Sequence, residues 1–274
     1  MPIKLIAVDL DGTLLTSDYT ISTPDQAALK RATQLGIKVL ITTGRSEAES
    51  RIYASQIGAF EYMITHAGAC LYHRPSNQYV ASQALAKQAT YHILNILDEY
   101  DDVFFEAYSL NHGYTTQKAY QNFHTCGLRS GFLTVTSPML HVVSQYEAIS
   151  AYHDIHKFFL CSANPYSISS LKTRMKDVPH VQVVSSLSTA LEFYSPSADK
   201  GHVLCSLSQM LHIPQEEIMC IGDSENDIGL FLHCGIKVAM GNAFDCLKQM
   251  ADIVVRSHDQ SGVAQAIEYA LLQH

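Results

Sequence analysis

The segment IKLIAVDLDGT (3–13) constrains the fold of this chain most strongly, because a continuous apolar run ends directly in two carboxylates, Asp9 and Asp11. A run without polar alternation is typical of a strand that is covered on both faces, as in a parallel sheet between two layers of helices. Further apolar strands are predicted at 37–43 and 62–68, and helix signals lie between them. This alternation indicates right-handed crossovers and a parallel sheet.

The helix signals between these strands are local and specific. In STPDQAALKRATQLG (22–36), Thr23 is predicted as the N-cap, and Gln26 would complete a capping box. Ser46 and Glu49 form a second predicted capping box. Two helix–strand units therefore follow the first strand.

The pattern returns late in the chain after a different middle part. A helix is predicted at 201–213, and the strand in IMCIGDSEND (218–227) again ends in acids. The middle, 83–189, is rich in Tyr and Phe and has short strand-like pieces without carboxylate ends. We therefore predict an α/β fold, a doubly wound parallel-sheet core formed by residues 1–82 and 190–274, with an α+β domain inserted at 83–189.

Composition excludes several classes of protein. The chain has 274 residues, a formal net charge of −8 and no Lys/Arg cluster, which argues against binding to nucleic acid or to an anionic membrane. No apolar run approaches the roughly 18 residues that would span a bilayer, and we find no signal peptide. The 7 cysteines are scattered without a CxxC pair, as expected of free thiols in a reducing compartment. We expect a cytoplasmic monomer or homodimer.

Asp9 and Asp11 raise the question of function. Residues i and i+2 of a strand point to the same side, so both carboxylates can face one crevice at the carboxyl end of the strand. Two carboxylates this close repel each other, which leaves a metal site, an acid/base pair, or a nucleophile beside an acid. Gly12 permits a tight turn with backbone N–H groups available to an anion. The alternative is that the two aspartates only cap a turn.

Other strand ends also carry side chains that can bind a cation or a phosphate. Asp223 ends a late strand, and Asp227 follows four residues later at the start of a helix. Thr43 ends the second strand in TTGR, and Lys200 begins a helix. In a doubly wound sheet these strand ends share one edge.

The order DLDGT, TTGR, a lysine before a helix, and GDSEND resembles the haloacid dehalogenase-like superfamily. It is most similar to the Cof-type (subclass IIB) phosphatases, which carry a large α+β cap of the C2 type after the third strand. The resemblance covers both core segments and extends to VAMGNA (238–243) and DQSGVAQAI (259–267). It implies a Mg²⁺-dependent phosphatase that acts on a small phosphorylated metabolite.

The resemblance also implies roles for individual residues. Asp9 would form an aspartyl-phosphate, and Asp11 would protonate the leaving alcohol, which needs a raised pKa, and then deprotonate water. Mg²⁺ would be held by Asp9, the backbone carbonyl of Asp11, and Asp223. Asp227 would orient Lys200 or a metal-bound water. The implied phosphate contacts are Leu10, Gly12, Thr43, Gly44, Arg45, Lys200 and Asn226.

Some features stay open at this point. Ala67 stands where the family usually has Asn, so that contact is missing or is supplied by His66. Arg45 could reach the cap or the substrate, or it could form a salt bridge at a helix start. The 14 histidines show no HxxxH or HExxH spacing and are interpreted as surface and cap residues.

Three other functions compete with hydrolysis. A phosphotransferase or phosphosugar mutase would pass the phosphoryl group from the same aspartate to a sugar hydroxyl. A signalling receiver also uses an aspartate, Mg²⁺, a Thr and a Lys, but the insertion at 83–189 argues against it. The last is a binding protein without catalysis. The residues do not specify the substrate.

Overall fold

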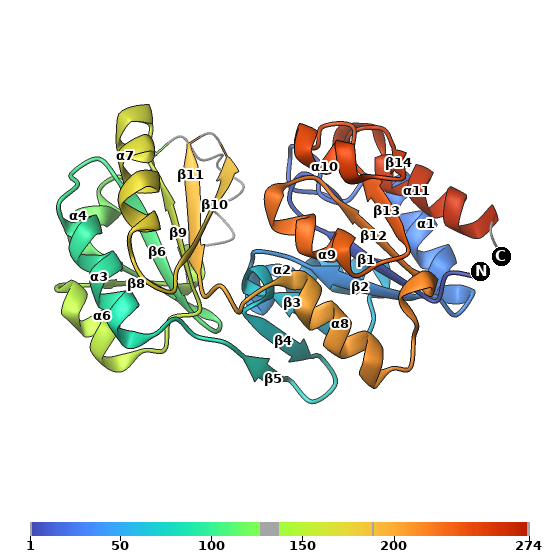
Figure 1. Cartoon of the computed structure of the whole chain (residues 1–274), viewed down its shortest axis with the longest axis horizontal. Helices are drawn as coiled ribbons and strands as arrows, with labels where there is room; N and C mark the ends of the chain where they lie inside the picture. Colours follow the sequence, from blue (N-terminus) through green and yellow to red (C-terminus); the bar gives the residue numbers. More distant parts are fainter. Residues whose placement is uncertain (1, 127–136, 188, 273–274) are drawn as a thin grey trace. The chain divides into compact units, whose positions relative to one another are not determined.

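The computed structural model describes residues 2–126, 137–187 and 189–272, and the chain divides into two compact units (Figure 1). The first unit consists of residues 1–81 and 199–274, and the second of residues 82–198. The range predicted for the inserted domain includes 127–136 and 188, which lie outside the described residues.

An eight-stranded sheet in the order β14-β13-β12-β1-β2-β3-β4-β5 forms the centre of the first unit. Neighbours from β14 to β3 are parallel, whereas β4 is antiparallel to β3. The strands are β1 (Leu5–Asp9), β2 (Lys38–Thr42), β3 (Tyr62–Thr65), β4 (Cys70–His73), β5 (Gln78–Ser82), β12 (Ile218–Gly222), β13 (Ile236–Ala239) and β14 (Ile253–Val254). Every residue of β1 and β12 is buried, as the continuous apolar runs predicted.

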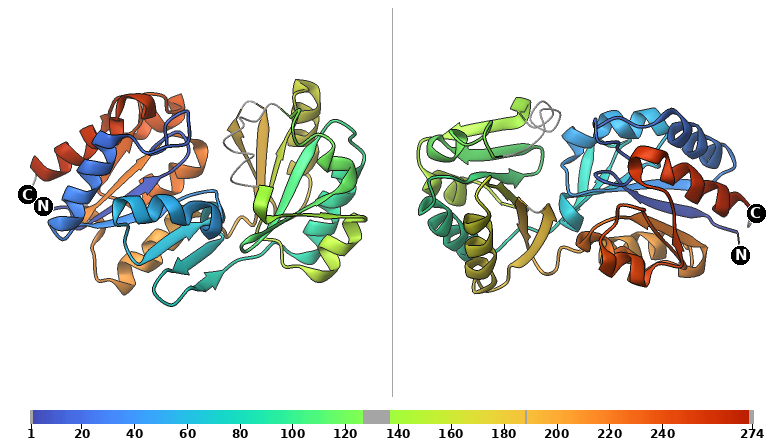
Figure 2. Two further views of the ribbon diagram at one scale, coloured as in Figure 1. Left: turned by 180° about the vertical axis from the view of Figure 1, so that it is seen from behind. Right: turned by 90° about the horizontal axis from the view of Figure 1, so that it is seen from above.

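Helices cover both faces of this sheet (Figure 2). They are α1 (Thr23–Gln34), α2 (Glu47–Ile57), α8 (Lys200–Met210), α9 (Ile228–Leu232), α10 (Asp245–Met250) and α11 (Gly262–Leu272). Short 3₁₀ turns are η1 (His66–Gly68), η3 (Gln215–Glu217), η4 (Glu225–Asp227) and η5 (His258–Gln260). Helix α1 packs against α2 and α11, and α8 packs against α9. This arrangement confirms the predicted doubly wound α/β fold.

One capping box is confirmed and one N-cap prediction is wrong. The Ser46 hydroxyl accepts from the backbone N–H of Glu49, and the Glu49 carboxylate accepts from the backbone N–H of Ser46. For α1 the N-cap is Ser22, one residue before the predicted Thr23. Ser22 donates to the buried carboxylate of Asp25 at 2.6 Å, and Asp25 also accepts from the backbone N–H of Ala264 at 2.7 Å. A tertiary contact with α11 thus accompanies the cap.

A six-stranded sheet in the order β10-β11-β9-β6-β7-β8 forms the second unit. Its strands are β6 (Phe104–Ser109), β7 (His112–Thr116), β8 (Leu140–Val143), β9 (Lys157–Cys161), β10 (Gln182–Leu187) and β11 (Ala190–Tyr194). Its helices are α3 (Lys87–Asp98), α4 (Gln117–Tyr120), α6 (Tyr146–Tyr152) and α7 (Pro165–Lys176), with a 3₁₀ turn η2 (Ser137–Met139). The strands pair antiparallel except β7 and β8, which are parallel. The mixed pattern agrees with the predicted α+β character.

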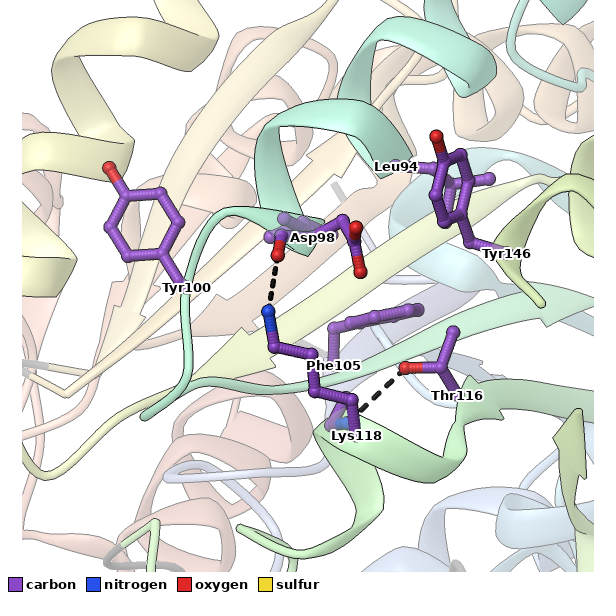
Figure 3. Close-up of a pocket in the computed structure, with 9 residues that line it drawn as sticks. Leu94, Asp98, Tyr100, Phe105, Thr116, Lys118 and Tyr146 are labelled. Carbon is purple, nitrogen blue, oxygen red and sulfur yellow. Dashed lines mark hydrogen bonds between the residues drawn. The ribbon is translucent and has the colours of Figure 1, made fainter. Parts of the chain in front are cut away.

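A small pocket lies within the second unit, beside α3, α4 and β6 (Figure 3). Leu94, Phe105 and Tyr146 supply apolar walls. Lys118 is its cationic group, but the ammonium already donates to the backbone carbonyl of Asp98 and forms an ion pair with Asp101 at 2.9 Å. The charged side of this pocket is therefore neutralised by the protein itself.

The boundary between the units differs from the predicted one at its second crossing. Residues 190–198 were predicted with the core, but β11 (Ala190–Tyr194) pairs with β9 and β10 in the six-stranded sheet. A short buried apolar run does not reveal which sheet it joins. Strands β4 and β5 were not predicted, since their segment is short and contains polar turn residues.

All seven cysteines are free thiols, in agreement with their scattered positions. Among the described residues, no helix combines the length and the apolarity needed to cross a membrane.

Candidate active site

Three strands end together at the centre of the first unit, because β1 pairs in parallel with both β2 and β12. The strand order changes direction at β1, and open α/β sheets bind ligands at such a switch point. Asp9 lies opposite Thr42 in the β1–β2 register. The structure therefore brings the acid-ended strands to one edge, as predicted.

Asp9 is a buried carboxylate that contacts a buried lysine. Its side chain is almost fully covered, and Oδ1 accepts from Nζ of Lys200 at 2.8 Å. Burial raises the pKa of Asp9 well above its ordinary value, Lys200 lowers it, and the neighbouring carboxylates of Asp227 and Asp223 raise it further. The ionised form of Asp9 therefore needs more positive charge than Lys200 alone supplies.

Lys200 joins the carboxylates to one another. Its side chain is 0% exposed, and Nζ donates to Asp9, to Asp227 at 2.7 Å and to Oδ1 of Asn226 at 3.1 Å. Burial alone would lower the pKa of Lys200, but Asp227 and Asp9 together raise it. The side chain is thus a fixed ammonium ion.

The backbone position of Lys200 depends on a glycine. Gly68 has φ +96°, and a Cβ there would lie 2.3 Å from the carbonyl carbon of Asp199 and 2.4 Å from the nitrogen of Lys200. The side chain of Asp199 caps α8 by accepting from the backbone N–H of His202. Close packing of η1 against the start of α8 therefore places the lysine.

Asp223 and Asp227 follow β12. Asp227 is fully buried, and its Oδ2 accepts from the backbone N–H groups of Asp223 at 3.0 Å and Ser224 at 3.3 Å. Asp223 accepts from the Thr13 hydroxyl at 3.3 Å. Burial, followed by the charge of Asp227, raises the pKa of Asp223 to about 8. Both oxygens of Asp227 are occupied, since Oδ1 binds Lys200.

The donor set fits a hard divalent cation. Asp9, Asp223 and Asp227 each offer an oxygen, and these three oxygens lie within 4.8 Å of one another. Three carboxylates beside one ammonium ion leave excess negative charge, and a cation would remove it. Ligands that are all oxygen suit Mg²⁺. The carboxylate group therefore agrees with the predicted Mg²⁺ site.

Gly12 lets the loop after β1 approach this group. It has φ +76°, and a Cβ would lie 2.3 Å from Oδ2 of Asp223. Asn242 holds the same loop, because its Nδ2 donates to the Gly12 carbonyl at 2.8 Å while its Oδ1 accepts from the backbone N–H of His258 at 3.0 Å. The Ser17 backbone N–H and hydroxyl both donate to Asp259, each at 2.7 Å. The VAMGNA and DQSG motifs thus fix the loop that carries Asp11.

Arg45, whose partner the sequence did not determine, forms an ion pair with Asp11. Nε of Arg45 donates to Oδ2 of Asp11 at 2.7 Å, and Nη2 donates to Oδ1 at 2.6 Å. Arg45 is buried beside the rings of Tyr19 and Tyr53, at 5.3 and 5.7 Å from their centroids. The guanidinium group therefore faces Asp11, and its predicted contact with phosphate stays a prediction.

The other predicted phosphate ligands lie in turns after β1 and β2 or beside Lys200. The buried Thr43 hydroxyl accepts from the Arg45 backbone N–H at 3.1 Å, a contact that does not use the hydroxyl hydrogen. Leu10 is buried and accepts from the backbone N–H groups of Thr13 and Leu15. Gly44 lies between Thr43 and Arg45. Their contacts with phosphate stay predictions.

The turn η1 contains Ala67, which stands where the family usually has Asn. His66, Ala67 and Gly68 all have positive φ, at 54°, 57° and 96°. The backbone N–H of Ala67 donates to the Thr43 carbonyl at 3.0 Å, which ties this turn to the end of β2. His66 is buried, with Nδ1 at 3.0 Å from the Thr65 hydroxyl.

Comparison with known proteins agrees with these motifs. The haloacid dehalogenase-like hydrolase family matches residues 6–267. Phosphatase YwpJ of Bacillus subtilis is 29% identical over an alignment length of 286 residues, and the alignment covers 98% of this chain and 100% of that protein. YwtE of the same organism, a 5-amino-6-(5-phospho-D-ribitylamino)uracil phosphatase, is 28% identical, with 98% of each chain covered.

A solved structure of a haloacid dehalogenase-like hydrolase from B. subtilis has a TM-score of 0.84 at 27% identity, covering 97% of this chain and 99% of that one. The fold, the order of the motifs and the clustered carboxylates all agree with the family that the comparison gives. The chain therefore belongs to the haloacid dehalogenase-like hydrolases, and among them to the Cof type.

Proposed function

We propose that this protein is a Mg²⁺-dependent phosphatase that hydrolyses the monoester of a small phosphorylated metabolite through an aspartyl-phosphate at Asp9. One observation carries the proposal: the buried Asp9, Asp227 and Lys200 and the half-buried Asp223 form one group at the ends of β1 and β12. Such a group can hold a cation and a phosphate dianion side by side.

In the first half-reaction, a carboxylate oxygen of Asp9 attacks phosphorus and the ester P–O bond breaks. The leaving alkoxide takes a proton from Asp11. Lys200 donates to Oδ1 of Asp9 and holds that carboxylate in one orientation. In the second half-reaction, water attacks the aspartyl-phosphate, Asp11 takes a proton from that water, and Asp9 is released as a carboxylate.

Asp9, the backbone carbonyl of Asp11, and Asp223 would hold the ion. Asp227 would support them, since Lys200 and two backbone N–H groups already occupy its oxygens. When bound, Mg²⁺ supplies the positive charge that favours ionised Asp9 and stabilises charge on the transferring phosphoryl group.

The Asp11–Arg45 pair bears on the acid/base role. A bidentate guanidinium contact stabilises the carboxylate form of Asp11. This form suits the second half-reaction, in which Asp11 accepts a proton from water. In the first half-reaction Asp11 must hold a proton, so the leaving oxygen would have to replace at least one contact with Arg45.

The relatives support the reaction class, since YwpJ and YwtE are both phosphatases by name. We assign residues 1–81 and 199–274 the chemistry, and the second unit the selection of the leaving group. Sugar phosphates, nucleotides and cofactor phosphates all belong to the proposed substrate class.

Phosphate release from 4-nitrophenyl phosphate and a panel of metabolite phosphates, with Mg²⁺ and with EDTA, tests the proposal. The panel includes the substrate named for YwtE. We expect Mg²⁺-dependent release that Asp9→Asn abolishes. The matched control is Asp18→Asn, which removes an exposed carboxylate from the same loop and should leave release unchanged. Release that persists in Asp9→Asn, or a phosphorylated acceptor without free phosphate, would contradict the proposal.

A further inference from the structure

Three histidines of the second unit come together although no spacing in the sequence links them. His112 begins β7, His141 lies in β8, and His153 follows α6. Nδ1 of His112 lies 3.1 Å from Nε2 of His141. The ring of Tyr114 stacks on His141 at 5.3 Å and on His153 at 3.9 Å between centroids.

Strand pairing brings the first two together. β7 and β8 are parallel, and Tyr114 lies opposite His141 in their register. His112 and Tyr114 are two residues apart on one strand, so their side chains share a face of the sheet. His141 lies beside both on β8, the last strand of the sheet order, and the rings of His112 and His141 are exposed to solvent. Water can therefore reach the pair.

The separation of the two nitrogens matches that of two ligands on one ion. Imidazole nitrogens bound at about 2.0–2.1 Å to one ion would lie roughly 2.9 Å apart at a right angle and roughly 3.3 Å apart in a tetrahedron. The observed 3.1 Å falls between these values. Imidazole is a ligand for Zn²⁺, Ni²⁺ and Cu²⁺, whereas Mg²⁺ prefers oxygen. The pair thus differs in metal preference from the carboxylates of the first unit.

A bound ion would replace the hydrogen atom that lies between Nδ1 of His112 and Nε2 of His141, because imidazole binds metal through an unprotonated nitrogen.

We propose that His112 Nδ1 and His141 Nε2 bind a divalent transition-metal ion of the Zn²⁺, Ni²⁺ or Cu²⁺ class, with water as the remaining ligands. The ion would join the edge strand β8 to β7. Neither histidine is one of the proposed catalytic residues, and metal binding by the pair does not depend on phosphatase activity. The competing explanation is a simple hydrogen bond between two surface imidazoles.

The test is calorimetric titration of the untagged full-length protein with Zn²⁺ in the presence of millimolar Mg²⁺, which occupies the carboxylate group. The variants are His112→Ala and His141→Ala. The matched control is His92→Ala, which removes an exposed imidazole from α3 of the same unit. His141→Gln keeps a polar side chain on the edge strand and guards against a misfolded Ala variant. Circular dichroism checks that each variant folds.

We expect one Zn²⁺ to bind the unaltered protein and His92→Ala. Loss of an outer-shell partner alone reduces metal affinity about 10–100-fold, so loss of a ligand at 112 or 141 should weaken binding at least about tenfold. A visible Cu²⁺ absorption band typical of nitrogen ligation should vanish in the same variants. Equal Zn²⁺ binding in all variants, or no binding by the unaltered protein, would overturn the proposal.

Discussion

Replacing Lys200 with Met removes the charge that neutralises the buried carboxylates. Lys200 is 0% exposed and donates to Asp9 at 2.8 Å and to Asp227 at 2.7 Å. Met has a similar length and an apolar chain, so the change deletes the ammonium without opening a large cavity. Two carboxylates, each almost fully buried, then lack their common cation.

Removing one partner of a buried ion pair costs about 3–5 kcal/mol, because the other charge stays buried. Protonation of the acids can relieve part of this cost. In Lys200→Met the pKa of Asp9, which burial already raises, should rise further because the ammonium that lowers it is gone. The loss of stability should therefore be small at acidic pH and grow as the pH rises through the raised pKa of Asp9. Mg²⁺ should restore part of the stability at neutral pH.

Urea unfolding followed by circular dichroism, in EDTA at several pH values, measures this effect. The matched control is Lys30→Met on the exposed face of α1, for which we expect a change within about 0.5 kcal/mol. A loss for Lys200→Met no larger than for Lys30→Met, or one that does not change with pH, would contradict this prediction.

Three further predictions concern the same unit. Because burial raises the pKa of Asp223 to about 8, Mg²⁺ must displace its proton at neutral pH. The apparent Mg²⁺ affinity measured by calorimetry should therefore rise roughly fivefold from pH 7 to pH 8. An affinity that does not change with pH would contradict this prediction. Asn242→Ala should weaken Mg²⁺ binding severalfold in the same titration, since its contact with the Gly12 carbonyl is lost; unchanged affinity would rule out this positioning role. Gly68→Ala should lower the unfolding free energy by much more than Gly36→Ala, for which we expect a loss of about 1–2 kcal/mol. Both glycines have positive φ, but of the two only Gly68 has backbone atoms within 3 Å of the added Cβ. Equal losses in urea denaturation would contradict this prediction.

Sequence patterns predicted the fold where the signal is local. The buried runs of β1 and β12 and the Ser46–Glu49 capping box depend on neighbouring residues, and all were predicted correctly. The N-cap of α1 was missed although its signal is also local, because the Ser22 hydroxyl accepts from the backbone N–H of Asp25. The sheet to which 190–194 belongs depends on pairing with β9, which a run of five buried residues does not reveal.

In the candidate site, too, sequence patterns predicted which strand ends meet but not every side-chain contact. Asp9, Asp223, Asp227 and Lys200 come together because strand ends of a doubly wound sheet share one edge, which the sequence pattern implied. The direction of the Arg45 side chain depends on packing between Tyr19 and Tyr53, and no local signal encodes it.

Two other contacts also required the folded structure. Asn242 reaches the carbonyl of Gly12 across 230 positions of sequence. His112 and His141, 29 positions apart, meet only through the parallel pairing of β7 with β8. Sequence spacing alone therefore missed both contacts.

The proposed mechanism requires that Asp9 carry the phosphoryl group during turnover. Acid quenching of the protein during Mg²⁺-dependent hydrolysis, followed by peptide mass spectrometry, tests it most directly. We predict that the peptide containing Asp9 gains the mass of one phosphoryl group, that Asp9→Asn abolishes this gain, and that Asp18→Asn preserves it. Sustained phosphate release with no phosphorylated Asp9 at any quench time would contradict the claim.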